Sequence, residues 1–166
     1  MRNLIAVPVI FLAVILQSSI VSGITVLSGY ADLPLVMISA WALQPSVDTA
    51  WHWAIAAGVL VGFVSGVPWI VPVAGYAIVV ALAKILQLRV WQAPLLAMFS
   101  ISVLGTIVID ALVFTSMRVS GVIIPFQDAF GLQTLPRILL NLVLSIPVYA
   151  IMRDLALWTY PSPEAE

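Results

Sequence analysis

Apolar residues occupy this chain in six stretches, separated by short groups of polar residues, proline and glycine. A helix needs about 20 predominantly apolar residues to cross the ~30 Å hydrocarbon core of a bilayer, and five of the stretches approach or exceed that length. The predicted spans are about Leu4 to Val21, residues 31–45, Trp51 to Val67, Pro72 to Leu88, Gln92 to Met117 and Leu135 to Leu157. The pattern predicts an all-α integral membrane protein with about six transmembrane helices, in a single transmembrane domain over residues 1–160.

The second stretch is irregular. Between Asp32 and Pro45, the apolar run from Leu33 to Gln44 has only 12 residues, which is about 18 Å of helix and too short to cross the core. We expect this helix to begin before Asp32, to stop partway, or to sit within the protein. Between the last two stretches, Arg118 to Thr134 is predicted as the longest and most polar loop, with Val122 to Phe126 as a candidate interfacial piece.

Composition supports the membrane prediction and excludes several functions. The chain is 63% hydrophobic and 8% charged, whereas soluble domains carry about 25% charged residues. It has no cysteine, one histidine and a net charge of −1, so it offers no thiolate or histidine-cluster metal site and no basic surface for nucleic acid. No nucleophile lies at a useful spacing from a base, and no glycine loop for phosphate is present. We expect a protein that is not an enzyme, without a metal or cofactor and without a nucleic-acid partner.

Positive charges predict an orientation. With six spans and a cytoplasmic N-terminus, Arg118 and Arg137 lie outside, and the cytoplasmic side carries Arg2, Lys84, Arg89 and Arg153. Because cytoplasmic loops carry the excess of lysine and arginine, both termini are predicted in the cytoplasm. The tail, residues 161–166, is short, acidic and proline-containing, and we expect it to be disordered.

Small residues recur at every fourth position of the third span. They form what we call the small-residue strip: Ala50, Ala54, Gly58, Gly62 and Gly66. Such a strip lies on one helix face and lets another backbone approach closely. It predicts either packing within this chain or a face for a partner helix.

Polar residues form stripes of the same spacing on the last two spans. Together these stripes are the predicted polar clamp: Ser102, Thr106 and Asp110 on one span, and Arg137, Asn141 and Ser145 on the other. Asp110 is the only acidic residue well inside a span, where a charge costs roughly 2.5–3.5 kcal/mol on insertion scales. We expect Asp110 to meet Asn141, with Arg137 or Arg118 as its counter-charge. A structural clamp, a ligand or partner contact, and a proton or ion relay are the three interpretations, although a relay normally needs several ionisable groups in series.

The order of these features resembles one family. The segments that carry the resemblance are Leu16-Gln17-Ser18-Ser19, Asp32-Leu33-Pro34-Leu35-Val36, Gly58-Val59-Leu60-Val61-Gly62-Phe63-Val64-Ser65-Gly66, Gly75-Tyr76-Ala77 and Leu139-Leu140-Asn141-Leu142-Val143-Leu144. In this order they resemble MreD, the multi-spanning rod shape-determining protein of bacteria. The chain departs from the family where members often carry an acidic residue after the third span, since it has Val67-Pro68-Trp69 there.

The resemblance implies a fold like that of the substrate-binding subunits of energy-coupling-factor vitamin transporters, and a non-enzymatic role in the bacterial cell membrane. MreD-like proteins bind the single-span protein MreC and work with MreB, the glycosyltransferase RodA and its penicillin-binding partner in peptidoglycan synthesis. The small-residue strip is then a candidate seat for a partner helix or a second copy of the chain.

The alternative function is that of a vitamin-binding transporter subunit itself. Such subunits often carry an Ala-x-x-x-Ala face on the first span, but Ala6 and Ala13 are seven apart here. Gln127, Asp128 and Phe130 imitate an outer ligand-capturing loop only weakly.

Overall fold

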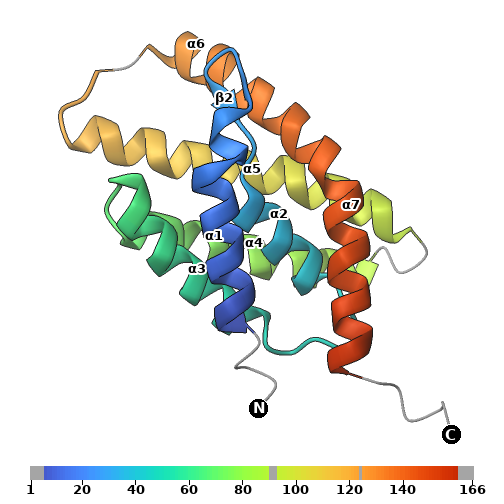
Figure 1. Cartoon of the computed structure of the whole chain (residues 1–166). Helices are drawn as coiled ribbons and strands as arrows, with labels where there is room; N and C mark the ends of the chain where they lie inside the picture. Colours follow the sequence, from blue (N-terminus) through green and yellow to red (C-terminus); the bar gives the residue numbers. More distant parts are fainter. Residues whose placement is uncertain (1–5, 90–92, 124, 161–166) are drawn as a thin grey trace, which may run out of the picture.

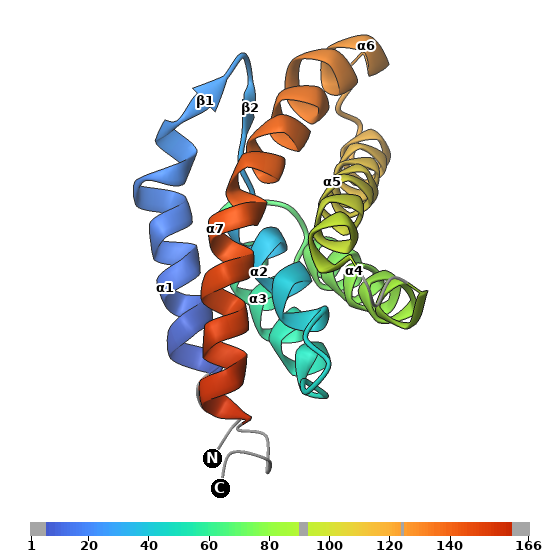
Figure 2. The same cartoon turned by 90° about the vertical axis from the view of Figure 1, so that its right-hand side faces the viewer.

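The computed structural model describes residues 6–89, 93–123 and 125–160, and Figure 1 shows them as a bundle of helices. The start of α1 and the end of α7 lie at the same end of this bundle (Figures 1 and 2). In chain order, the elements are α1 (Ala6–Ser19), η2 (Val21–Gly23), β1 (Thr25–Val26), β2 (Gly29–Tyr30), α2 (Leu33–Ala42), α3 (Ala50–Ser65), α4 (Ile70–Arg89), α5 (Pro94–Val119), α6 (Phe126–Asp128), η3 (Ala129–Thr134) and α7 (Leu135–Thr159).

Each predicted span contains a helix, but the helices differ in length. Among the described residues, three helical stretches are long and apolar enough to cross a membrane: Ile70–Leu88, Pro94–Val119 and Phe126–Thr159. The other three apolar helices are shorter, at Pro8–Gly23, Leu33–Ala42 and Ala50–Ser65. Six crossings, and the orientation of the termini, therefore stay predictions. The beginning of the first predicted span and the predicted disordered tail lie outside the described residues.

Helix α2 is the centre of the bundle. Nine of its ten residues are buried, and it packs against α1, α3, α4, α5 and α7. Figure 2 shows it behind α7, with α1 on one side and α4 and α5 on the other. It begins at Leu33, directly after Asp32, whose side chain accepts a hydrogen bond from the Leu35 amide as a helix cap. Of the three possibilities for this short span, the helix therefore sits within the protein.

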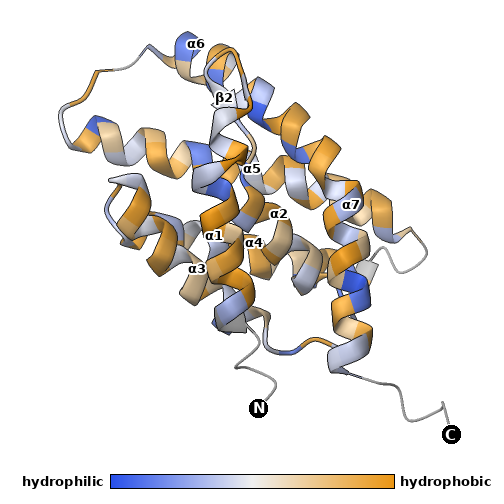
Figure 3. Cartoon of the chain, in the orientation of Figure 1, coloured by the Kyte–Doolittle hydropathy of each residue, from blue (hydrophilic) through white to orange (hydrophobic). Residues whose placement is uncertain are grey.

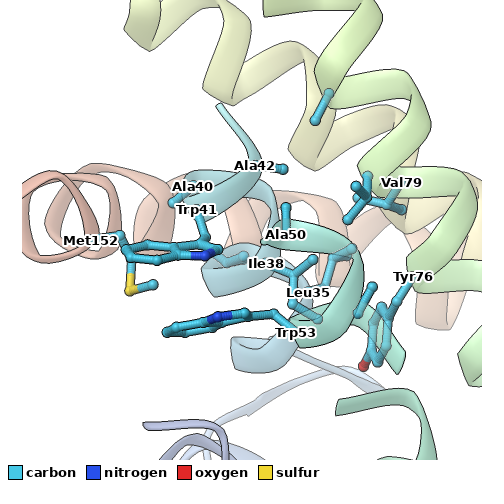
Figure 4. Close-up of a cluster of buried hydrophobic side chains, with 14 of the residues drawn as sticks. Leu35, Ile38, Ala40, Trp41, Ala42, Ala50, Trp53, Tyr76, Val79 and Met152 are labelled. Carbon is cyan, nitrogen blue, oxygen red and sulfur yellow. The ribbon is translucent and has the colours of Figure 1, made fainter. Parts of the chain in front are cut away.

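A pair of stacked tryptophans fills the core beside α2. The rings of Trp41 and Trp53 lie 4.4 Å apart, centre to centre, with 26° between their planes. Both residues are buried, as is Met152 of α7 next to them (Figure 4). Trp41 thus belongs to the core, which explains why it falls in the middle of its stretch instead of at a membrane interface.

The outside of the bundle is largely apolar. Phe63, Leu88 and Ile123 are each more than 80% exposed, and Figure 3 shows hydrophobic residues along the length of most helices. Exposed apolar surface of this extent indicates contact with lipid or with other membrane helices.

The predicted loop from Arg118 to Thr134 is wrong over its second half. The chain is helical from Phe126 onwards and runs through η3 into α7. Aromatic contacts favour this helix, because the Phe126 ring stacks on Phe130 at 5.8 Å and meets Phe114 edge-on at 6.0 Å. The short hairpin of β1 and β2 was also not predicted. It runs close to the start of α7, where a Cβ atom added to Gly29 would lie 2.6 Å from the Gln133 carbonyl oxygen.

Candidate functional site

The small-residue strip on α3 is covered by α4. A Cβ atom added to Gly58 would lie 2.5 Å from the Cα atom of Val73 in α4, and one added to Gly62 would lie 2.7 Å from the Cα atom of Trp69, directly before α4. Contacts this close show that the two backbones touch along these glycines, in the way that small residues allow in membrane helices. At these positions the strip is therefore a packing face within the chain.

The two ends of the strip have different environments. Ala50 and Ala54 are fully buried, so neither is available to a partner. Gly66 has open space around it and a φ of +67°, and it ends α3 as a left-handed cap. Of the two interpretations, packing within this chain therefore holds from Ala50 to Gly62, where no seat for a partner helix or a second copy remains.

The polar stripes of α5 and α7 face each other. Three side-chain contacts join them: Ser102 to Ser145 with 2.7 Å between the hydroxyl oxygens, Asn141 Nδ2 to Thr106 Oγ1 at 2.8 Å, and the ion pair of Arg137 with Asp110. The residues of these contacts are four apart on each helix, so they form successive rungs of a ladder. All six residues predicted for the polar clamp belong to it.

The pairing within this ladder differs from the expected one. Asp110 was expected to meet Asn141, but the Asn141 amide donates to Thr106, one turn away. Arg137 is the counter-charge of Asp110, whereas the Arg118 guanidinium lies 5.1 Å above the Phe114 ring. The stripes are aligned so that the Arg137 guanidinium lies against the Asp110 carboxylate. The Asn141 amide lies against the Thr106 hydroxyl, and the Ser145 hydroxyl lies against that of Ser102. This alignment leaves no unpaired guanidinium in the ladder.

Asp32 belongs to the same polar cluster, although it was not among the residues predicted for the clamp. Its backbone amide donates to Asn141 Oδ1 at 2.7 Å, and its carboxylate oxygen Oδ1 accepts from the Tyr76 hydroxyl at 3.2 Å. From α1, Gln17 donates to the Ala31 carbonyl and accepts from the Leu33 amide, both at 2.8 Å. The beginning of α2 is therefore held by side chains of α1, α4 and α7.

Arg137 links Asp32 to the ladder electrostatically. Its charge interacts with both Asp32 and Asp110, its Nε donates to the Tyr30 carbonyl at 3.2 Å, and its guanidinium lies 4.8 Å from the Tyr30 ring centre. Of the two carboxylates, only that of Asp110 forms an ion pair with Arg137. Within the described residues, Asp110 Oδ2 is fully enclosed and has no hydrogen-bond partner.

A cavity of about 360 Å³ opens beside this cluster. Its polar lining includes Gln17, Tyr30, Asp32, Tyr76, Gln133 and Arg137. Its apolar lining includes Val61 of α3 together with Val113 and Met117 of α5. The polar cluster and the cavity together are the candidate functional site.

This arrangement is suited to holding helices together or to holding a ligand. Within the described ranges, no group of three histidine or acidic side chains is placed to hold a metal ion. The pair Arg153–Asp154 is an exposed contact between chain neighbours, and His52 is exposed at the start of α3. Comparisons with models of protein families, with curated proteins and with solved structures found no match to this chain.

Proposed function

We propose that this chain is a non-enzymatic membrane scaffold of the bacterial cell-elongation machinery, of the MreD kind. One observation carries the proposal. Four of the five segments that resemble MreD each contribute a polar side chain to the cluster at the start of α2: Gln17, Asp32, Tyr76 and Asn141. Four segments that lie far apart in the sequence therefore meet at one polar cluster, which gives a structural reason for the polar residues on which the resemblance to MreD depends.

The fifth segment has a packing role of its own. It is the glycine-rich part of α3, and Gly58 and Gly62 bring α4 close to it. The Gly75-Tyr76 segment follows closely after Val73 on α4, and the Tyr76 hydroxyl donates a hydrogen bond to Asp32. A sequence that keeps all five segments would keep both the central polar cluster and the close α3–α4 contact, which supports a resemblance in fold and not only in composition.

In this proposal the chain passes through the cell membrane six times, with the short α2 enclosed by the other helices during its passage, with both termini in the cytoplasm and with a fold like that of energy-coupling-factor substrate-binding subunits. It binds an MreC-like single-span protein and supports peptidoglycan synthesis together with MreB, RodA and the penicillin-binding partner. Because α4 covers the small-residue strip, a partner helix would bind one of the outer apolar faces. Exposed side chains on three such faces are Phe11 of α1, Phe63 of α3 and Val143 of α7.

Copurification tests this proposal. The tagged chain is expressed with the MreC-like protein of the same genome, solubilised in mild detergent and isolated, with an unrelated six-span protein as control bait. We expect the MreC-like protein to be retained by this chain alone. A photo-crosslinking residue placed in turn at Phe11, Phe63 and Val143 should give a crosslink from one face and not from all three.

The outcome also separates the two candidate functions. Mass spectrometry of the purified chain reports any vitamin that it retains. Failure to bind the MreC-like protein, combined with retention of a vitamin at one copy per chain, would replace the scaffold by the transporter subunit.

A further inference from the structure

The polar cluster beside the cavity has an unbalanced set of charged groups. Asp32 and Asp110 are acidic, and Arg137 is the only cation among the described residues that contacts either of them within salt-bridge distance. With all three groups ionised, the formal charge of the cluster is −1. A buried charge without a partner is costly, so the cluster is stabilised by one additional positive charge, either a proton on a carboxylate or a cationic occupant.

The unmatched charge lies on Asp32. Arg137 is already paired with Asp110, and among the described residues no basic side chain forms an ion pair with Asp32. Asp32 is only 8% exposed. Its Oδ1 is occupied by the Leu35 amide and the Tyr76 hydroxyl, whereas its Oδ2 has no hydrogen-bond partner in the described part of the chain. Because Asp32 lines the cavity and Oδ2 is not among the enclosed unpartnered atoms, this oxygen is open to an occupant.

The rest of the cavity indicates the shape of that occupant. Opposite the polar cluster, the wall is apolar and includes Val61, Val113 and Met117. Ser18, Ser22 and Ser65 also line the cavity and are exposed, so they mark the side from which a molecule enters. A pocket with a few polar groups at one end and apolar walls elsewhere is typical of small-molecule sites.

We propose that this cavity binds a small amphipathic molecule that carries a primary ammonium group. The ammonium donates to Asp32 Oδ2 and balances the charge of the cluster, and the apolar part lies against the walls from α3 and α5. A primary ammonium can come from a soluble amine or from the ethanolamine headgroup of a lipid. This site is independent of the proposed scaffold role, since it needs no partner protein.

Binding of three probes of similar size tests the proposal. They are 2-phenylethylamine, 2-phenylethanol and phenylacetate, which carry a positive, a neutral and a negative end on the same ring. Each is titrated by calorimetry into the full chain in dodecyl maltoside micelles. We expect saturable binding of the amine, at least about tenfold tighter than that of the alcohol, because a charge-assisted hydrogen bond is roughly twice as strong as a neutral one. We expect no binding of the acid.

Two variants and a matched control locate the site. Asp32→Asn keeps an oxygen to cap α2 but removes the charge, and it should weaken amine binding about tenfold or more. Val113→Phe fills the cavity without changing the polar cluster, and it should also abolish amine binding. Asp154→Asn makes the same chemical change at an exposed residue outside the cavity and should bind the amine as the unchanged chain does. If Asp32→Asn fails to fold, Val113→Phe alone decides the location.

A competition experiment distinguishes a lipid headgroup from a soluble amine as the source of the ammonium. Phosphatidylethanolamine added to the micelles weakens amine binding if the lipid headgroup occupies the cavity, and leaves it unchanged if the natural occupant is a soluble amine. Equal binding of the amine and the alcohol would mean that Asp32 carries its own proton, and would overturn the proposal. Retention of full amine binding by Asp32→Asn or by Val113→Phe would overturn it as well.

Discussion

Replacement of Gly58 by alanine tests the close packing of α3 and α4. The added Cβ atom would lie 2.5 Å from the Val73 Cα atom and 2.8 Å from both its amide nitrogen and its Cγ2 atom. Carbon atoms in favourable contact are about 3.5–4.0 Å apart, so the new methyl group is about 1 Å too close. Two of these neighbouring atoms belong to the backbone, which cannot rotate away as a side chain does.

The cost follows from this geometry. Either α4 moves away from α3 or the methyl group remains compressed, and overpacking of this kind typically costs about 1–3 kcal/mol. We expect Gly58→Ala to lower the free energy of unfolding by about that amount. Gly62→Ala should have a similar effect, because its Cβ atom would lie 2.7 Å from the Trp69 Cα atom.

Unfolding in mixed micelles, with increasing fractions of dodecyl sulfate and helix content followed by circular dichroism, measures these changes. Gly131→Ala is the matched control, because nothing lies within 4 Å of the Cβ atom that it adds. Its stability should stay within about 0.5 kcal/mol of the unchanged chain. A Gly58→Ala variant as stable as the unchanged chain, or a Gly131→Ala variant that loses as much stability as Gly58→Ala, would contradict the close contact of α3 with α4.

Three further predictions concern the ladder between α5 and α7 and use the same unfolding assay. Replacement of Arg137 by methionine should cost about 3–5 kcal/mol, because it leaves the buried charge of Asp110 unpaired. Replacement of Asp110 by leucine should cost less, because the charge of Asp32 still interacts with Arg137. The double variant should cost less than the sum, and strict additivity would show that the pair does not interact. Asn141→Leu removes the acceptor for the Asp32 amide and the donor to Thr106, and should cost about 1–3 kcal/mol, so an unchanged stability would contradict the assigned contacts. Ser145→Ala breaks a single interhelical hydrogen bond and should cost only about 0.6 kcal/mol. A loss larger than that of Asn141→Leu would show that Ser145 contributes more than Asn141 to the contact between the two helices.

The long apolar runs were sufficient to predict the long helices. The run from Pro72 to Leu88 became α4, which extends from Ile70 to Arg89, and the run from Gln92 to Met117 became α5, from Pro94 to Val119. In these runs the requirement to satisfy backbone hydrogen bonds away from water leaves the helix as the favoured structure. Local sequence is therefore enough to determine the element, apart from its exact ends.

The stretch before α7 could not be predicted in the same way. Its polar residues and Pro125 indicate a loop, yet the chain from Phe126 is helical. The contact of Phe126 with Phe114 joins residues from two different helices. Such contacts between distant segments leave no signal in local periodicity.

The candidate site also combines features that local sequence predicts with features that depend on contacts between distant segments. Spacing of four predicted which residues of α5 and α7 share a face, because helix geometry fixes that. It did not predict which residue lies opposite which, since the alignment of two helices depends on packing of the whole chain; hence Asn141 was assigned to Asp110 instead of Thr106. Asp32 was missed as a member of the cluster for the same reason, although an aspartate directly before an apolar run is a recognisable helix-cap signal.

Depletion of this protein in the cells that make it tests the proposed scaffold role most directly. Cell width and the rate of peptidoglycan insertion along the cell wall are measured as the protein is lost, and again after the unchanged chain is restored. The scaffold role predicts that cells widen and lose their shape, that insertion along the side wall falls, and that both recover on restoration. Unchanged shape and insertion, together with a fall in the uptake of a vitamin, would contradict it.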